Sequence, residues 1–154
     1  MRRPGVDLLR KVLLVTDARP CLHHVVFCVE RAHQDDAATL WKDLGFELIE
    51  IDLPDVGLRV LLDWTRGIEI ISPSDVNAAE GARVQQFLDE RGEGVYSIVV
   101  LTNDIDGPLS VAGRYGATPQ LRQDRGGDGF ALEEAMLNPV YGMPITFIAT
   151  DLPA

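Results

Sequence analysis

The sequence contains few of the residues that mark several classes of protein. Cysteine occurs only twice, at Cys21 and Cys28, and there is no CxxC pair, which argues against a zinc ribbon, a dithiol redox centre or a disulfide framework. Basic residues number 14 against 24 acidic ones, so the net charge is -10 and the chain repels nucleic-acid phosphates and anionic lipid. We therefore expect no nucleic acid and no membrane among its partners.

Long apolar runs are also missing from the sequence. No stretch approaches the ~20 apolar residues that cross a bilayer. The basic start at residues 1–5 is followed by a segment that Asp7, Arg10 and Lys11 interrupt, which makes a poor secretory signal, so we expect a cytoplasmic protein. What the 154 residues do contain is 46% hydrophobic side chains, enough for the core of one globular domain and too few residues for two of ordinary size.

The first half of the chain predicts a strand, a helix and three more strands. Residues 22–29 are rich in β-branched and aromatic side chains, which is typical of a strand. Residues 46–51, 58–64 and 68–71 predict the later strands, between segments rich in turn residues. The helix between them has apolar residues at helical spacing and a glycine stop: Ala37, Leu40, Trp41, Leu44 and Gly45.

The second half begins with the same pattern and then becomes less regular. A linker helix with Asn77 as its cap leads to a strand from Val95 to Thr102 and a short helix that ends at Gly116. Glycines and charges at residues 122–128 predict a surface loop, residues 131–137 predict a short helix, and residues 145–149 predict a closing strand. The two halves, of roughly 70 residues each, indicate an internal repeat whose second copy lacks one strand.

Four segments resemble the vicinal oxygen chelate (glyoxalase/bleomycin resistance/dioxygenase) superfamily in order and spacing, and its methylmalonyl-CoA epimerase branch most. The segments are residues 22–29, 41–47, 67–73 and 87–98. The resemblance implies an α+β fold in which two βαβββ modules form a curled mixed sheet around a cavity. It divides one domain, residues 1–154, into an N-terminal extension (1–20), a first module (21–73), a linker helix (74–94) and a second, incomplete module (95–154).

Proteins of this superfamily hold a divalent metal with one side chain from the first strand and one from the last strand of each module. Carried over by position, the first module offers His24 and Glu69, and Glu69 would also be the catalytic carboxylate. The second module offers Ser97, beside Tyr96, as substrate-pocket residues in place of a histidine, and the resemblance finds no counterpart for the fourth ligand. A serine hydroxyl is a poor ligand for a first-row metal, so only half of the coordination sphere is expected.

The residues themselves leave a plainer interpretation open. A histidine on an apolar strand is often a hydrogen-bonded core residue, and Tyr96 and Ser97 fit an ordinary strand. Glu69 is more informative, because a carboxylate within an apolar strand should face a cavity, a cation or water. His23 is expected on the face opposite His24, and His33 in a solvated helix.

Two functions are consistent with these observations. The first is binding of a small acyl or oxo-acid ligand with metal-assisted proton transfer, of the epimerase, isomerase or lyase type. The second is a metal-free, catalytically inactive protein that binds or sequesters a small molecule, as bleomycin-resistance relatives do. The resemblance further implies a homodimer, and residues 11–16, which have strand composition, are a candidate for the missing strand.

Overall fold

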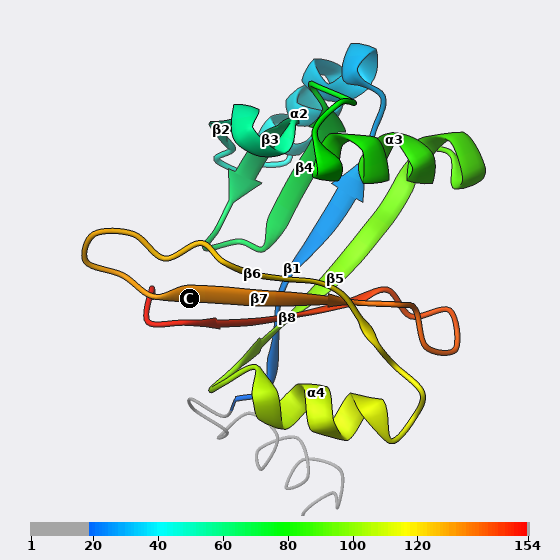
Figure 1. Cartoon of the computed structure of the whole chain (residues 1–154). Helices are drawn as coiled ribbons and strands as arrows, with labels where there is room; N and C mark the ends of the chain where they lie inside the picture. Colours follow the sequence, from blue (N-terminus) through cyan, green and yellow to red (C-terminus); the bar gives the residue numbers. More distant parts are fainter. Residues whose placement is uncertain (1–18, 154) are drawn as a thin grey trace, which may run out of the picture.

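Eight strands form one mixed sheet in the order β2-β3-β4-β1-β5-β8-β7-β6 in a computed structural model that describes residues 19–153 (Figure 1). The strands are β1 (Cys21–Cys28), β2 (Ile49–Leu53), β3 (Leu58–Asp63), β4 (Ile68–Pro73), β5 (Gly94–Thr102), β6 (Pro119–Asp124), β7 (Leu132–Leu137) and β8 (Ile145–Thr150). The helices are α2 (Gln34–Asp43), α3 (Ala79–Arg91) and α4 (Asp106–Gly113), with 3-10 turns η1 (Arg31–His33) and η2 (Pro54–Val56). The predicted α+β fold with a curled, glyoxalase-like mixed sheet is confirmed.

The two modules follow the same path through this sheet. In each, the first strand pairs in parallel with the last strand of its own module, β1 with β4 and β5 with β8. The two first strands, β1 and β5, pair with each other in antiparallel fashion at the centre of the sheet. The first strands of the two modules therefore run in opposite directions where the modules meet.

The second module is complete, so the prediction that it lacks its last strand is wrong. The expected surface loop contains the end of β6, and the expected short helix is β7, which pairs with β6 on one side and β8 on the other. Only alternate side chains of β6 are partly buried, so its sequence is mostly polar. The sequence of β7, LEEAML, favours a helix, but pairing on both sides overrides that preference. Residues 11–16, the candidate substitute, lie outside the described residues.

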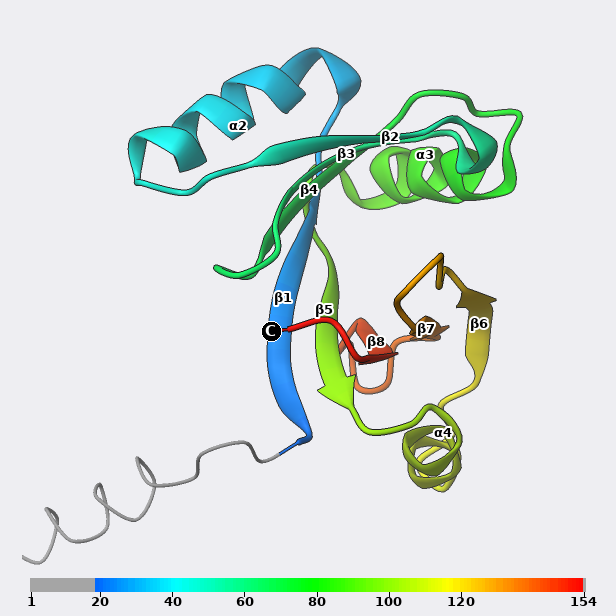
Figure 2. The same cartoon turned by 90° about the vertical axis from the view of Figure 1, so that its left-hand side faces the viewer.

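Helices α2 and α3 cover opposite faces of the first module (Figure 2). Ala38 and Trp41 of α2 pack with Leu61, Ile68 and Ile70, whereas Val84 and Leu88 of α3 pack with Val60 and Ile71. The predicted apolar face of α2 is partly wrong. Leu40 and Leu44 are exposed, and the side of the helix that faces the sheet contains the buried Gln34 instead. The side-chain amide of Gln34 donates hydrogen bonds to the carbonyls of Arg59 and Ile70.

The start of α3 also differs from the prediction. The helix begins at Ala79 without a side-chain cap, and Asn77 instead donates to the carboxylate of Asp75 in the turn before it. Within residues 19–153, no helix combines the length and apolar character that crossing a membrane would need.

Candidate functional site

A cavity of about 560 Å³ lies between the two modules and is lined by strands of both. Helix α3 and strands β6 to β8 lie on the same side of β1 and β5 (Figure 2). Most of the wall is apolar, with Val60, Ile71, Val99 and Ile148 among its residues. Within this wall, all four site residues proposed from the sequence come together: His24, Glu69, Tyr96 and Ser97.

His24 and Glu69 form a direct pair across the first module. Val26 of β1 is in register with Glu69 of β4, and His24 lies two residues earlier on the same face. The distance from His24 Nε2 to Glu69 Oε2 is 3.0 Å, with the histidine 5% and the glutamate 19% exposed. The carboxylate that the sequence predicts to face a cavity, a cation or water thus lines a cavity.

His23 lies beside His24 because β1 contains a bulge. Leu22 pairs with Val100 and His24 with Val99, so His23 is an extra residue that breaks the alternation of side chains. Its Nδ1 lies 2.7 Å from His24 Nδ1, and its ring packs edge-on against Trp64 with centroids 4.3 Å apart. The expectation that His23 is separated from His24 on the opposite face is therefore wrong. A bulge of this kind leaves no clear signal in a single sequence.

The surroundings of His23 determine which of its ring nitrogens forms a hydrogen bond. Burial, followed by the nearby His24 and Arg19, lowers the pKa of His23 to about 4, so the ring is neutral at neutral pH. Its Nε2 is buried and has no hydrogen-bond partner among the described residues, which leaves Nδ1 as its bonding atom. If Nδ1–H donates to His24 Nδ1, then His24 presents an Nε2–H to Glu69. In that arrangement His23 sets the tautomer of the histidine in the cavity.

Ser97 and Thr146 form the matching pair across the second module. Val99 of β5 is in register with Thr146 of β8, just as Val26 is with Glu69. Ser97 Oγ and Thr146 Oγ1 are 2.7 Å apart, and the two residues are 3% and 6% exposed. Thr146 therefore occupies the position of the fourth ligand, for which the resemblance finds no counterpart. The sequence pattern does not identify it, because β6 and β7 lack strand-like patterns and β8 is therefore not recognisable as the fourth strand of a complete module.

Tyr96 precedes Ser97 at a second bulge. Val26 pairs with Ser97 and Phe27 with Val95, so Tyr96 is the extra residue in β5, as His23 is in β1. Its ring packs edge-on against Phe87 of α3 with centroids 5.1 Å apart. Burial, with a smaller contribution from Glu80, raises the pKa of Tyr96 to about 12, so its hydroxyl stays protonated and remains a donor.

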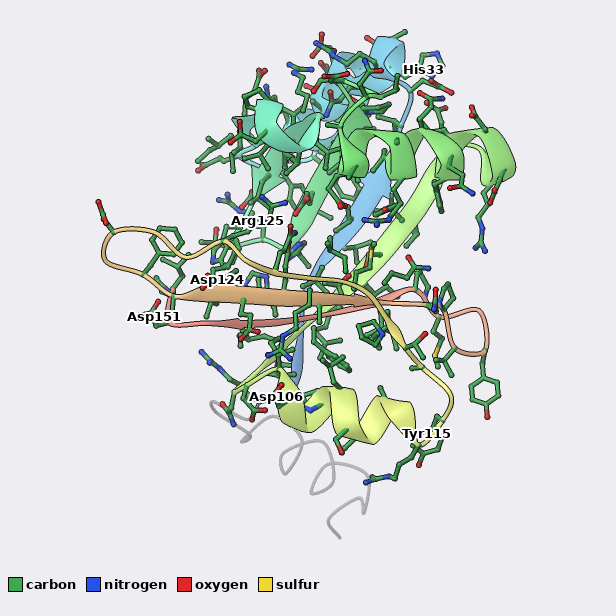
Figure 3. All side chains as sticks on the ribbon, in the orientation of Figure 1. His33, Asp106, Tyr115, Asp124, Arg125 and Asp151 are labelled. Carbon is green, nitrogen blue, oxygen red and sulfur yellow. The ribbon has the colours of Figure 1, made fainter. Side chains whose placement is uncertain are left out.

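Charged groups in the cavity wall are mainly acidic. Besides Glu69, the wall contains Glu80, Asp124 and Glu134, and within residues 19–153 its one arginine or lysine is Arg125. Arg125 and Asp124 lie together at the end of β6 (Figure 3), and Arg125 already contacts Glu134 at 3.0 Å. An anionic ligand would meet little compensating positive charge here.

The donor set does not fit a resident divalent metal ion. It offers one imidazole, one carboxylate and two neutral hydroxyls. The imidazole and the carboxylate already contact each other, and so do the two hydroxyls. Protein sites for such ions ordinarily use at least three strong ligands. In the part of the chain that the structure describes, no group of three or more His, Cys, Asp or Glu side chains is placed to hold a metal ion.

No protein-family model matches the sequence, and no curated protein matches it. Solved structures do resemble the fold. A hypothetical protein from Bacillus halodurans C-125 superposes with a TM-score of 0.69 at 20% identity, over 89% of this chain and 99% of that one. A variant of Streptomyces coelicolor methylmalonyl-CoA epimerase in complex with 2-nitronate-propionyl-CoA gives 0.65 at 18% identity, over 88% and 100% of the chains.

Methylmalonyl-CoA epimerase from Mycobacterium tuberculosis gives a TM-score of 0.58 at 21% identity, over 91% of this chain and 94% of that one. The chain therefore shares the glyoxalase-like fold of these methylmalonyl-CoA epimerases, as the sequence segments predicted. At these identities the similarity concerns the fold alone.

Proposed function

We propose that this protein binds a small, largely apolar acyl or oxo compound in the cavity between its modules, without a resident metal ion. The observation that carries the proposal is the convergence of two polar pairs, His24 with Glu69 and Ser97 with Thr146, on one apolar cavity. Ligand sites in proteins typically combine such an apolar wall with a few converging polar groups. The homodimer implied by the resemblance remains a prediction, which light scattering in solution tests.

The size and character of the cavity support this class of ligand. A volume of about 560 Å³ suits a small molecule. Apolar side chains would bury the hydrocarbon part of an acyl or oxo compound, because removing apolar surface from water is favourable. The polar pairs would then orient its oxygen atoms.

Isothermal titration calorimetry with cyclohexyl methyl ketone as the probe tests this proposal. We expect saturable binding that is unchanged after treatment of the protein with a chelator. Leu62→Trp, which fills the wall of the cavity, should weaken binding at least tenfold. Leu40→Trp makes the same change on the exposed face of α2 and should leave binding unchanged.

Metal analysis of protein purified without chelator completes the test. Stoichiometric divalent metal that disappears in His24→Ala, together with binding that requires the metal, would contradict the metal-free proposal. It would instead support the metal-assisted function that the resemblance implied.

A second candidate function is metal-free proton transfer of the epimerase or isomerase type. The observation in its favour is that Glu69, a carboxylate within the cavity, is held by the imidazole of His24. Glu69 would remove a proton from a carbon next to the carbonyl of the ligand and return it. His24 would orient the carboxylate, and a hydroxyl of the second module would donate to the oxygen on which negative charge develops.

Deuterium exchange distinguishes this candidate from simple binding. In deuterated buffer, NMR would follow the loss of the protons next to the carbonyl of the same ketone. Catalysis predicts exchange well above the buffer rate, and Glu69→Gln should abolish that exchange while preserving binding, since the amide keeps the shape of the carboxylate. Exchange at the buffer rate with intact binding would leave the binding function alone.

A further inference from the structure

We infer that the Ser97–Thr146 hydroxyl pair is the element of the cavity that recognises the ligand, and that it binds a neutral carbonyl oxygen in place of the second half of a metal site. The inference deepens the proposed function and rests on it. It assigns the cavity to ketones, esters, amides or thioesters at this position, in preference to carboxylates.

The equivalence of the two pairs follows from the register of the sheet. In the first module β1 and β4 bring Val26 beside Glu69, and in the second β5 and β8 bring Val99 beside Thr146. His24 and Ser97 each lie two residues before the valine of their own strand, on its face. Position by position, Ser97 and Thr146 therefore replace His24 and Glu69.

The two pairs also face the same space. Across the antiparallel β1–β5 contact, Val26 is opposite Ser97 and His24 is opposite Val99. Ser97 is thus the diagonal neighbour of His24 on one face of the sheet. The cavity lined by both pairs lies on this face, so a ligand held by one pair is within reach of the other.

Hydrogen counting indicates that the hydroxyl pair has a donor to spare. Two hydroxyls carry two hydrogens, and one of these forms the bond between Ser97 Oγ and Thr146 Oγ1. Among residues 19–153, the further acceptor within reach is the carbonyl of Pro144, at 3.5 Å from Ser97 Oγ, which is the outer limit for such a bond. The second hydrogen can therefore turn to a ligand oxygen at little cost.

The charge of the wall determines which oxygen is accepted. Glu80 and Glu134 also line the cavity, and their arginine partners are already engaged with them. A carboxylate ligand would add negative charge next to these groups and lose its hydration, which is expensive without a cation. A neutral carbonyl oxygen accepts the same hydrogen bond without that cost.

A matched pair of probes tests the specificity. Cyclohexyl methyl ketone and cyclohexanecarboxylate have nearly the same size and differ in charge. We expect the ketone to bind at least tenfold more tightly in calorimetry at neutral pH. Either hydroxyl alone can still donate to the ligand, so the test uses the double variant S97A/T146V, which removes both donors with little change of shape. This variant should weaken ketone binding about five- to tenfold, as loss of one hydrogen bond does. Thr118→Val changes an exposed threonine outside the cavity and serves as the control.

The outcomes separate this inference from the proposed function. Ketone binding that the folded double variant S97A/T146V does not weaken would overturn the role of the hydroxyl pair and leave the binding function standing. Equal or tighter binding of the carboxylate would overturn the specificity. Absence of binding for both probes would overturn the inference and the proposed function together.

A gain of metal binding tests the positional equivalence without any organic ligand. The double variant S97H/T146E would create a set of two imidazoles and two carboxylates with His24 and Glu69. Titration with Co²⁺, followed by its visible absorption, should give one equivalent bound by the variant and none by the unchanged protein. His24→Ala in the same background should abolish the signal. If the double variant does not fold by circular dichroism, S97H alone provides three ligands and the same readout. A folded variant that binds no Co²⁺, or stoichiometric Co²⁺ in the unchanged protein, would contradict the inference.

Discussion

The two modules have the same strand pairing but differ in the side chains that this pairing brings together. In the first module the parallel contact between first and last strands joins an imidazole to a carboxylate, and in the second it joins two hydroxyls. The register is the same in both, with a valine of the first strand beside Glu69 or Thr146. The backbone thus determines where a functional pair can form, and the side chains at those positions determine its chemistry.

The connections before the last strand differ as well. In the first module β3 and β4 are joined by a tight turn that the buried carboxylate of Asp63 organises. This carboxylate accepts hydrogen bonds from the amides of Glu47 and Arg66 and lies 3.1 Å from the guanidinium of Arg66. In the second module residues 138–144 form a longer connection, held by the paired backbone of Val140 and Met143. The turn of the first module therefore depends mainly on the contacts of one side chain, Asp63.

The largest expected effect follows from removing that side chain. Asp63→Asn turns an acceptor of several hydrogen bonds into a group that is partly a donor, in a buried position. We expect a loss of about 3 kcal/mol in the free energy of unfolding by urea. Asp43→Asn, at an exposed position in α2, should change it by less than about 0.5 kcal/mol. Similar small effects for both variants would show that the turn does not depend on Asp63.

The contribution of Asp63 should also appear in the pH dependence of the free energy of unfolding. Burial alone would raise the pKa of Asp63, but hydrogen bonds from the amides of Glu47 and Arg66 and the Arg66 guanidinium outweigh it, so the pKa lies below its ordinary 3.8. A lowered pKa contributes stability that is present above the unfolded value and is lost as the pH falls through the folded value. The difference between the unchanged protein and Asp63→Asn should therefore shrink below about pH 4. A difference that stays constant to lower pH would contradict this assignment.

Substitution of one glycine in each connection compares the two connections more directly. Gly67 before β4 and Gly142 before β8 both have φ of 76°. A Cβ on Gly67 would lie 2.7 Å from the backbone oxygen of His23, whereas a Cβ on Gly142 would have no neighbour within 4 Å. We expect Gly67→Ala to cost about 2–3 kcal/mol and Gly142→Ala about 1 kcal/mol, the latter from the left-handed backbone alone. Equal losses in urea unfolding would mean that the close approach to His23 relaxes freely.

Breaking either pair in the cavity should cost less than removing the carboxylate of Asp63. His24→Ala removes the partner of the Glu69 carboxylate and of His23, and we expect it to cost about 2 kcal/mol at neutral pH. Ser97→Ala leaves only the Thr146 hydroxyl without its partner and should cost about 1 kcal/mol. Urea unfolding of both variants measures the difference. A greater loss for Ser97→Ala would indicate that the hydroxyl pair is structural rather than available to a ligand.

Much of the fold could be predicted because most elements have a regular pattern. β1, β3, β4, β5 and β8 are apolar strands, and the helices between them have helical spacing or glycine stops. β6 and β7 were missed for different reasons. β6 is an edge strand with a mostly polar sequence, and β7 consists of residues that favour a helix when they are not paired. Both segments become strands because they pair with segments that are distant in the sequence. A local sequence pattern does not reveal such pairing.

The site could be predicted where position alone determines it. His24, Glu69, Tyr96 and Ser97 were identified from spacing and resemblance, and all line the cavity. Thr146 depended on counting the strands of the second module correctly. The contact of His23 with His24 depended on a bulge in β1, which a single sequence does not reveal.

The bulges in β1 and β5 have one consequence for protein engineering. Each inserts one residue just before a cavity residue, so each central strand carries a two-residue unit, His23-His24 or Tyr96-Ser97, at the same point of its ladder. Because the flanking pairs already accommodate the insertion, such dipeptides could be exchanged between strands as cassettes with the register kept. Each exchange would then replace one cavity residue together with the residue before it.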